Sequence, residues 1–333
     1  MEKEKKNTEF KMPKMGGGLR SFLTQYIGQV VFLLLVFLFL SFATDNFLSS
    51  QNLINVMRQI STNMYVSCAL TMILICGGID LSTGSVMAFS GMIAGFLSLA
   101  GVPFWICAAC SLLAGAAVGF VSGFIISSTN LPPFIVTYSM QSILRGTVYV
   151  ITSANVLRLT DEAFLEFGGG SLGFIPWPVV YMILVIIATY MILNLSRLGR
   201  HMYATGGNVK AAEFSGIRVK RIRRFIYAAS GTMAALSGLV YTSRNTSMQP
   251  ALGTGMEMDA IAAVVLGGTS MGGGQGGVLG TVLGVLIIGF INNGLNLLRM
   301  NSFWQYICKG VVILIAVYLD DMKNKRMLRA TGK

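Results

Sequence analysis

Charged residues are scarce in this 333-residue chain, and it has a single histidine. Charged side chains make up 11% of the residues and hydrophobic ones 54%, whereas soluble domains carry about a quarter charged residues. His201 alone cannot supply a Ser/His/Asp triad or a zinc site, and no H-E-x-x-H motif occurs. No G-x-x-x-x-G-K-[ST] motif occurs either, which excludes a P-loop for nucleotide triphosphates. We therefore assign no catalytic residue and expect the chain not to be an enzyme.

Cysteine is rare and does not form a metal-site pattern. Cys107 and Cys110 make a C-x-x-C pair, but no histidine, carboxylate or second pair accompanies it. All five cysteines fall in apolar segments: Cys68, Cys76, Cys107, Cys110 and Cys308. Isolated cysteines in such surroundings behave as small packing residues. We expect no metal site, and metal or redox use of the pair is the minor alternative.

Long apolar stretches are what the chain has in abundance. Windows of about 17–25 apolar residues match helices that cross a hydrocarbon layer of about 30 Å, and short alternating strands are missing. The predicted fold is an all-α polytopic membrane protein of about ten transmembrane helices. The predicted spans are 27–44, 54–76, 84–100, 104–127, 133–152, 176–195, 225–243, 258–270, 278–298 and 303–319.

The net charge of +12 indicates topology rather than nucleic-acid binding. Basic residues gather before the first span, in the loop 197–224, which holds eight, and after the last span. Basic loops stay on the cytoplasmic side, so we expect both termini and this loop there. The predicted divisions are a basic tail (1–26), a transmembrane domain (27–319) containing the loop 196–224, and a second basic tail (320–333).

Two glycine-rich segments interrupt the helical pattern, Cys76–Gly95 and Leu266–Gly284. Broken helices in both halves of a transporter often mark the transport path, because irregular backbone at membrane depth must be buried in protein or line a wet cavity. The alternative is close helix packing through small residues. Packing is the favoured interpretation for four glycines: Gly91, Gly95, Gly280 and Gly284.

Ionisable and amide side chains inside apolar sequence are candidates for a substrate path, since burial of charge in a membrane is costly. Asp80 is expected to be deep, either on the path or as a helix-end cap, whereas Glu257 and Asp259 are placed at the edge of a span. Arg145 and Lys309 are interpreted as structural. Neutral polar groups suit an uncharged, hydroxyl-rich substrate or serve as interhelical contacts. The candidate path residues are Asp80, Thr62, Asn63, Gln141, Asn292, Asn293 and Asn296.

Three strings resemble a known family, in the same order along the chain. They are GGIDLSTGSVMAFSG (77–91), GGNVKAAEFSGIRVKRIRR (206–224) and DAIAAVVLGGTSMGGGQGGVLGTVLG (259–284). Over about residues 29–320 the chain is similar to the membrane permease of bacterial ribose-type sugar ABC importers. The resemblance implies a cytoplasmic coupling helix that docks on an ATPase. The residues it implies for coupling are Asn208, Ala211, Ala212, Glu213, Phe214, Ser215 and Gly216.

The resemblance also implies a set of partners and a location. A second permease chain, two cytoplasmic ATPase subunits and an extracytoplasmic sugar-binding protein would complete the importer in the bacterial cytoplasmic membrane. No cofactor is expected on this chain, because ATP and Mg²⁺ would be bound by the ATPase. Alternatives are a permease for nucleosides or other small polar solutes, or an ion-coupled carrier, which the sparse deep carboxylates disfavour.

Overall fold

The computed structural model describes residues 19–301 and a few single positions between 303 and 318. Most of the predicted tails and of the span 303–319, with Lys309, lies outside the described residues. The first helices are α1 (Leu19–Ala43), α2 (Ser50–Ile75), α3 (Thr83–Leu99), α4 (Phe104–Ser128), α5 (Pro133–Thr152) and α6 (Glu162–Gly169). The later ones are α7 (Trp177–Tyr190), continued by the π-helical η1 (Met191–Leu195), then α8 (Arg197–Gly207), α9 (Val209–Phe214), α10 (Val219–Arg244), α11 (Met256–Leu266) and α12 (Val278–Leu297).

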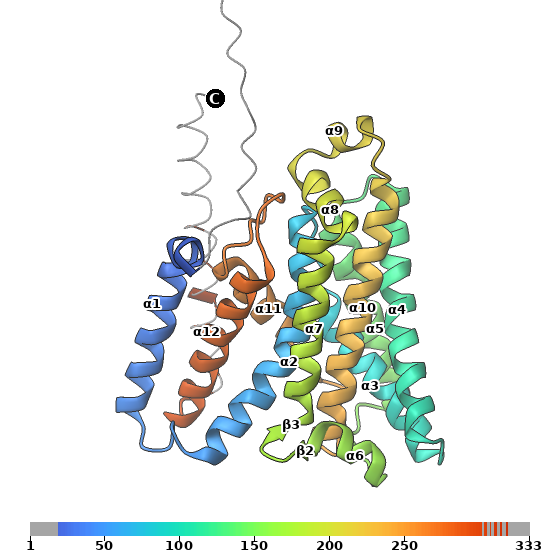
Figure 1. Cartoon of the computed structure of the whole chain (residues 1–333). Coiled ribbons are helices and arrows are strands. Elements are labelled where there is room, and N and C mark those ends of the chain that lie inside the picture. The colour runs from blue at the N-terminus through green and yellow to red at the C-terminus, as the bar shows by residue number, and fades with distance from the viewer. Residues whose placement is uncertain are drawn as a thin grey trace, which may run out of the picture.

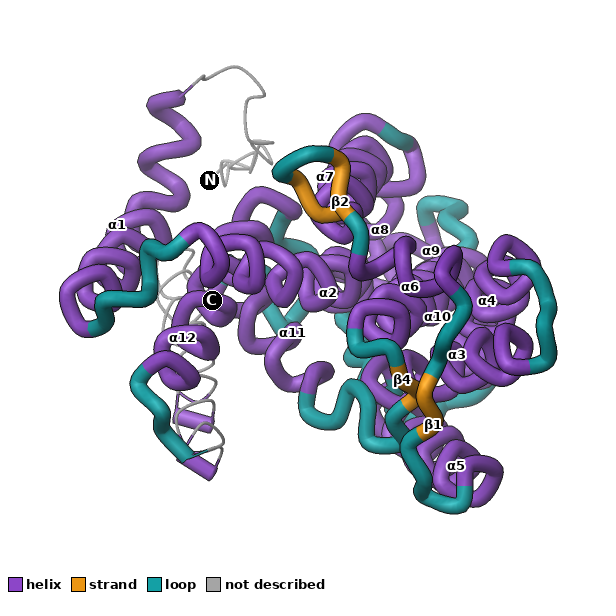
Figure 2. Tube along the Cα trace, turned by 90° about the horizontal axis from the view of Figure 1, so that it is seen from below, coloured by secondary structure: helices purple, strands orange, loops and turns teal. Residues whose placement is uncertain are grey.

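The long helices run between two ends of the molecule (Figure 1). The start of α1 and the helices α8 and α9 lie at one end, which we call the α9 end. The other end, the α6 end, carries α6 and two short pairs of strands, which are also visible in Figure 2. There β1 (Leu157–Arg158) pairs with β4 (Ser247–Met248), and β2 (Ser171–Leu172) pairs with β3 (Ile175–Pro176), both antiparallel.

The predicted membrane character is confirmed. Five helices of the described part are long and apolar enough to cross a membrane, namely α1, α4, α7 with η1, α10 and α12. Large apolar side chains on α1, α4 and α5 are exposed, as lipid-facing surfaces require. The predicted bounds of α5 coincide with those observed. By contrast, α10 begins at Val219, six residues before the predicted span, because its basic first turns continue the helix out of the apolar layer.

Glycines bring the helices at the centre of the bundle into direct backbone contact. A Cβ atom on Gly119 of α4 would collide with the carbonyl of Tyr227 on α10, and one on Gly115 would collide with that of Gly231. The same holds for Gly280 and Gly284 of α12, which would meet the carbonyls of Gly267 and Ala263. On α3, Gly91 and Gly95 meet the side chains of Thr242 and Met248. The packing interpretation of Gly91, Gly95, Gly280 and Gly284 is therefore confirmed.

Both predicted helix breaks are present. Helix α2 ends at Ile75, where Gly77 has φ +74° and Gly78 donates its N–H to the carbonyl of Ile73 at 3.0 Å, a glycine-based helix end. The predicted span 258–270 corresponds to α11, which begins two residues and ends four residues earlier than predicted. Helix α11 has 11 residues, about 16 Å at 1.5 Å per residue, or half of a hydrocarbon layer of about 30 Å. Irregular backbone at 249–255 and 267–277 extends it at both ends.

Candidate functional site

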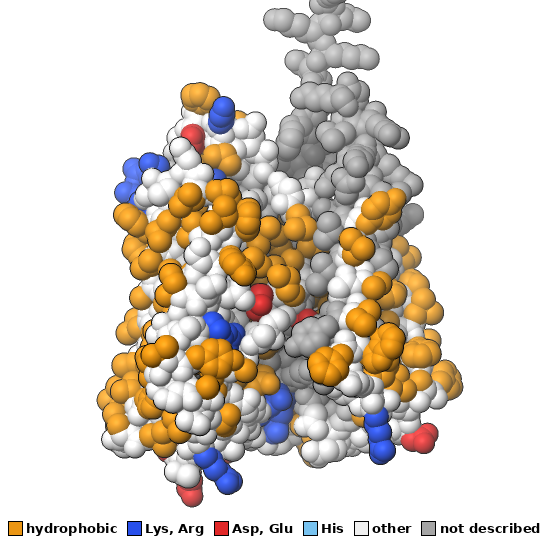
Figure 3. Space-filling view, turned by 180° about the vertical axis from the view of Figure 1, so that it is seen from behind, with side chains coloured by type: hydrophobic (Ala, Val, Ile, Leu, Met, Phe, Trp, Pro, Cys, Tyr) orange, Lys and Arg blue, Asp and Glu red, His pale blue; other side chains and the backbone are white. Residues whose placement is uncertain are grey.

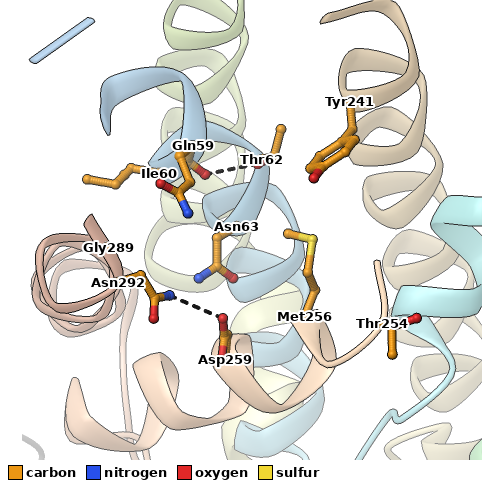
Figure 4. Close-up of a pocket in the computed structure, with 10 residues that line it drawn as sticks. All are labelled: Gln59, Ile60, Thr62, Asn63, Tyr241, Thr254, Met256, Asp259, Gly289 and Asn292. Atoms are coloured by element: carbon orange, nitrogen blue, oxygen red, sulfur yellow. Dashed lines mark hydrogen bonds between the residues drawn. The ribbon is translucent and has the colours of Figure 1, made fainter. Parts of the chain in front are cut away.

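A cavity of about 160 Å³ lies where α2, α10, α11 and α12 meet. Ten residues line it: Gln59, Ile60, Thr62, Asn63, Tyr241, Thr254, Met256, Asp259, Gly289 and Asn292 (Figure 4). Three of the predicted path residues, Thr62, Asn63 and Asn292, are among them. The volume is below the 300–1,000 Å³ typical of pockets for drug-sized molecules, so the cavity suits a small ligand.

Hydrogen-bonding groups cluster on one side of the cavity. Figure 4 shows the Gln59, Asn63, Asn292 and Asp259 side chains together, opposite the Tyr241 ring. The Asn292 amide donates to a carboxylate oxygen of Asp259 at 3.2 Å, and its own carbonyl oxygen is buried without a partner among the described residues. A buried acceptor without a partner costs about 1–3 kcal/mol. A ligand hydroxyl group could donate to this oxygen and remove that cost.

The start of α11 inside the bundle brings Asp259 to the cavity. Gly253 and Gly255 have φ +72° and +81°, a conformation that only glycine adopts without strain. Gly253 also packs its backbone against Gly84 of α3. As a result Glu257 and Asp259 are only 5% and 7% exposed. The two carboxylates lie in the first turn of α11, at the edge of the predicted span as expected. The prediction that Asp80 is the one deep carboxylate is wrong, because all three are buried.

Asp80 makes the contacts of a helix-end residue and does not line the cavity. One carboxylate oxygen accepts hydrogen bonds from the Ser82 N–H at 2.9 Å and the Ser82 hydroxyl at 2.6 Å. The other oxygen accepts the Ser230 hydroxyl of α10 at 2.7 Å. These bonds connect the irregular turn after α2 to the central helix. A role for Asp80 on the path stays a prediction.

The remaining predicted path residues lie outside the cavity lining. Asn293 exchanges hydrogen bonds with Asn52 of α2 at 2.8 and 3.2 Å, an interhelical contact. Gln141 donates its amide to Glu257 at 3.3 Å. Asn296 is exposed near the end of α12. The structure thus brings together three of the seven candidates, and a path role for the other four is not supported by a shared cavity.

The candidate coupling segment forms a short helix at one tip of the molecule, α9 (Figure 1). Asn208 caps it by accepting the Ala211 N–H at 3.0 Å, and Gly216, with φ +80°, ends it. Phe214 is 93% exposed, which is unusual for a large aromatic side chain. Ala212, which the resemblance also implies for coupling, is only 4% exposed, so its side chain faces inward rather than toward a partner.

A backbone junction connects the coupling segment to the cavity walls. At the end of α8, a Cβ on Gly206 would collide with the Ile75 carbonyl of α2 and the Gly274 N–H of the loop 267–277. Gly274 in turn donates to that carbonyl at 2.8 Å. Tyr203 of α8 donates its hydroxyl to the Gly276 carbonyl at 3.0 Å. Burial raises the pKa of Tyr203 to about 12, so its hydroxyl stays a donor even at alkaline pH.

Seven lining residues were not among the predicted path residues: Gln59, Ile60, Tyr241, Thr254, Met256, Asp259 and Gly289. Gln59 lies three and four residues before Thr62 and Asn63, the spacing of one helix face, so that pattern could have found it. Thr254 and Met256 flank a glycine that starts a helix inside the bundle. No local sequence pattern gives the depth at which such a helix begins.

Comparison with known proteins places the chain in a family. Residues 52–317 match the model of a family described as "Branched-chain amino acid transport system / permease component". The chain belongs to this permease family. The permease is therefore a multi-pass membrane protein of a transport system, as its apolar helices predict.

Three relatives of the permease are similar over nearly their whole length. It is 41% identical to the ribose import permease protein RbsC of Escherichia coli over 89% of this chain and 93% of the relative. It is 39% identical to RbsC of Bacillus subtilis over 97% and 100%. It is 37% identical to the D-allose transport system permease protein AlsC of E. coli over 88% and 90%. No solved structure matches the permease.

Proposed function

We propose that the permease is the membrane subunit of an ATP-driven importer of a monosaccharide such as ribose. The main support is the cavity, where three amide side chains and one carboxylate face a tyrosine ring. Amides and a carboxylate supply the acceptors and donors that sugar hydroxyl groups need, and an aromatic ring can cover an apolar sugar face. Relatives named for ribose and allose import support the same substrate class.

The proposed energy source is an ATPase that docks on α9. Phe214 projects from this helix as an exposed apolar anchor, and basic residues of the loop 197–224 flank it in the sequence. Aromatic anchors with charged surroundings are typical of binding hot spots. In the proposed assembly the α9 end is cytoplasmic, together with both termini, and ATP and Mg²⁺ are bound by the ATPase. This chain hydrolyses nothing.

The proposed assembly contains two copies or paralogues of the permease, two ATPase subunits and a sugar-binding protein. The binding protein would deliver the sugar at the α6 end, where α6 and the strand pairs cover the bundle. Closure of the ATPase dimer would move α9 and α8. The junction at Gly206 would pass this movement to the end of α2 and to the loop 267–277, and these two segments continue into the cavity walls.

The test is uptake of labelled ribose by proteoliposomes that contain the permease, the co-encoded ATPase and the binding protein. We expect uptake only with all components and ATP. Asn292→Leu, which removes the buried amide, should reduce uptake at least tenfold, since sites that hydrogen-bond a hydroxyl group discriminate strongly. Asn296→Leu, outside the cavity, serves as the matched control. Sugar uptake without an ATPase would refute the proposal.

A further inference from the structure

Charged side chains also lie away from the cavity, in the middle of the molecule. On the face drawn in Figure 3, basic and acidic side chains lie halfway between the two ends and are surrounded by apolar ones. Charge at this depth is costly to expose to lipid and is usually functional. Two polar side chains of α5, those of Arg145 and Gln141, are half-buried. They are four residues apart, so they share one face of the helix.

Both side chains reach the segment 249–257, which consists of the irregular stretch 249–255 and the first two residues of α11. The Arg145 guanidinium donates to the carbonyl oxygens of Pro250 and Leu252, each at 2.7 Å. The Gln141 amide donates to one carboxylate oxygen of Glu257 at 3.3 Å. Between these two attachments the segment contains Gly253 and Gly255, both in the left-handed conformation. The two α5 side chains therefore contact the irregular stretch 249–255 and the first turn of α11 that follows it.

This segment builds one wall of the cavity. Thr254 and Met256 line the cavity directly, and α11 starts from the segment and carries Asp259. Within the segment, three hydrogen-bonded turns hold the backbone, in which the N–H groups of Leu252, Thr254 and Met256 donate at 3.0–3.2 Å. Hydrogen bonds from a charged donor are stronger than neutral ones. The Arg145 bonds are thus the strongest attachment of the segment to a neighbouring helix among the described hydrogen bonds.

We propose that Arg145 and Gln141 are positioning residues that hold segment 249–257 in the cavity-forming arrangement. Helix α5 packs mainly on α3 and α4, at the edge of the bundle (Figure 2). A displacement of α5 would therefore pull on the cavity wall through these hydrogen bonds. Glu257 fits such a device, because its second carboxylate oxygen is buried and has no hydrogen-bond partner among the described residues. The Glu257 carboxylate also interacts electrostatically with Arg145. The role in transport rests on the proposed function.

Hydrogen–deuterium exchange of the full permease in nanodiscs tests the positioning without any sugar. We expect Arg145→Gln to speed exchange in residues 249–257 by about tenfold or more, the size of effect that loss of hydrogen bonds to a charged group produces. Exchange in α2 and α12 should not change. Arg145→Lys, which keeps a charged donor, should restore much of the protection. Ser142→Ala, an exposed α5 position whose hydroxyl bonds only its own helix, is the control.

A smaller perturbation keeps the test decisive if Arg145→Gln does not fold. Gln141→Leu removes only the attachment at Glu257, and we expect a local rise in exchange at residues 255–257. Wild-type exchange in both variants, or an equal rise throughout the molecule, would overturn the proposal. In the proteoliposomes described above, Arg145→Gln should lower sugar transported per ATP hydrolysed about tenfold, and Arg145→Lys should recover it. If the wild type transports no sugar, the exchange result still decides the positioning role.

Discussion

The exposed side chain of Phe214 gives the sharpest test of where the ATPase docks. The ring is 93% exposed, so nearly its whole surface is available to a partner. Full burial of a phenylalanine side chain contributes about 1.5–3 kcal/mol, and each 1.4 kcal/mol corresponds to about tenfold in Kd. Phe214→Ala should therefore weaken binding of the ATPase to the detergent-solubilised permease by about 10- to 100-fold. Surface plasmon resonance with immobilised permease measures this change.

The matched control lies at the opposite end of the molecule. Phe174, in the β2–β3 turn, is 95% exposed, and its replacement by alanine removes the same apolar area. Phe174→Ala should leave the affinity for the ATPase unchanged. Because Phe214 makes so little contact within the chain, its substitution should change the free energy of unfolding by about 0.5 kcal/mol or less. Unchanged ATPase affinity in Phe214→Ala would refute docking through α9.

Three further substitutions follow from the packing and the backbone. Gly119→Val overpacks the α4–α10 contact and should lower the free energy of unfolding by about 1–3 kcal/mol. Gly146→Val on α5, which has open space around it, should lower it much less. Equal losses of stability in the two variants would contradict the packing argument. Ser230→Ala removes a hydrogen bond of 2.7 Å to Asp80 and should lower stability by about 1–3 kcal/mol, measured by thermal unfolding. Gly216→Val strains the residue at φ +80° by about 1–2 kcal/mol and should reduce sugar uptake per ATP hydrolysed; full coupling would contradict a role for the α9 end.

Much of the fold follows from the sequence, because a bilayer imposes helix length directly. The predicted 133–152 matches α5 without error, since Pro133 fixes its first turn and Ser153, with φ +50°, ends it. The glycine-rich strings predicted both helix breaks, because glycine adopts the backbone conformations that end a helix. Hydropathy alone, however, does not distinguish a helix that crosses the whole membrane from the short helix α11. The irregular apolar backbone on either side of α11 has the same composition as an apolar helix.

The candidate site was only partly predictable. Thr62, Asn63 and Asn292 stood out because neutral polar groups are rare in apolar helices. The burial of Asp259 was not predicted, because it depends on the approach of Gly253 to Gly84, a contact between segments about 170 residues apart. Asn293 shows the opposite error. Its amide has the same chemistry as that of Asn292, but one helical step turns it from the cavity to Asn52 of α2.

The contact between α4 and α10 limits how this molecule can change shape. Where Gly115 and Gly119 meet α10, backbone touches backbone, so no side chains can change rotamer to let one helix slide along the other. Interfaces of this kind favour rigid-body movement. The two helices should therefore turn as one lever. Because α10 begins shortly after α9 and reaches the α6 end, a rotation of this helix pair would move both ends of the molecule at the same time.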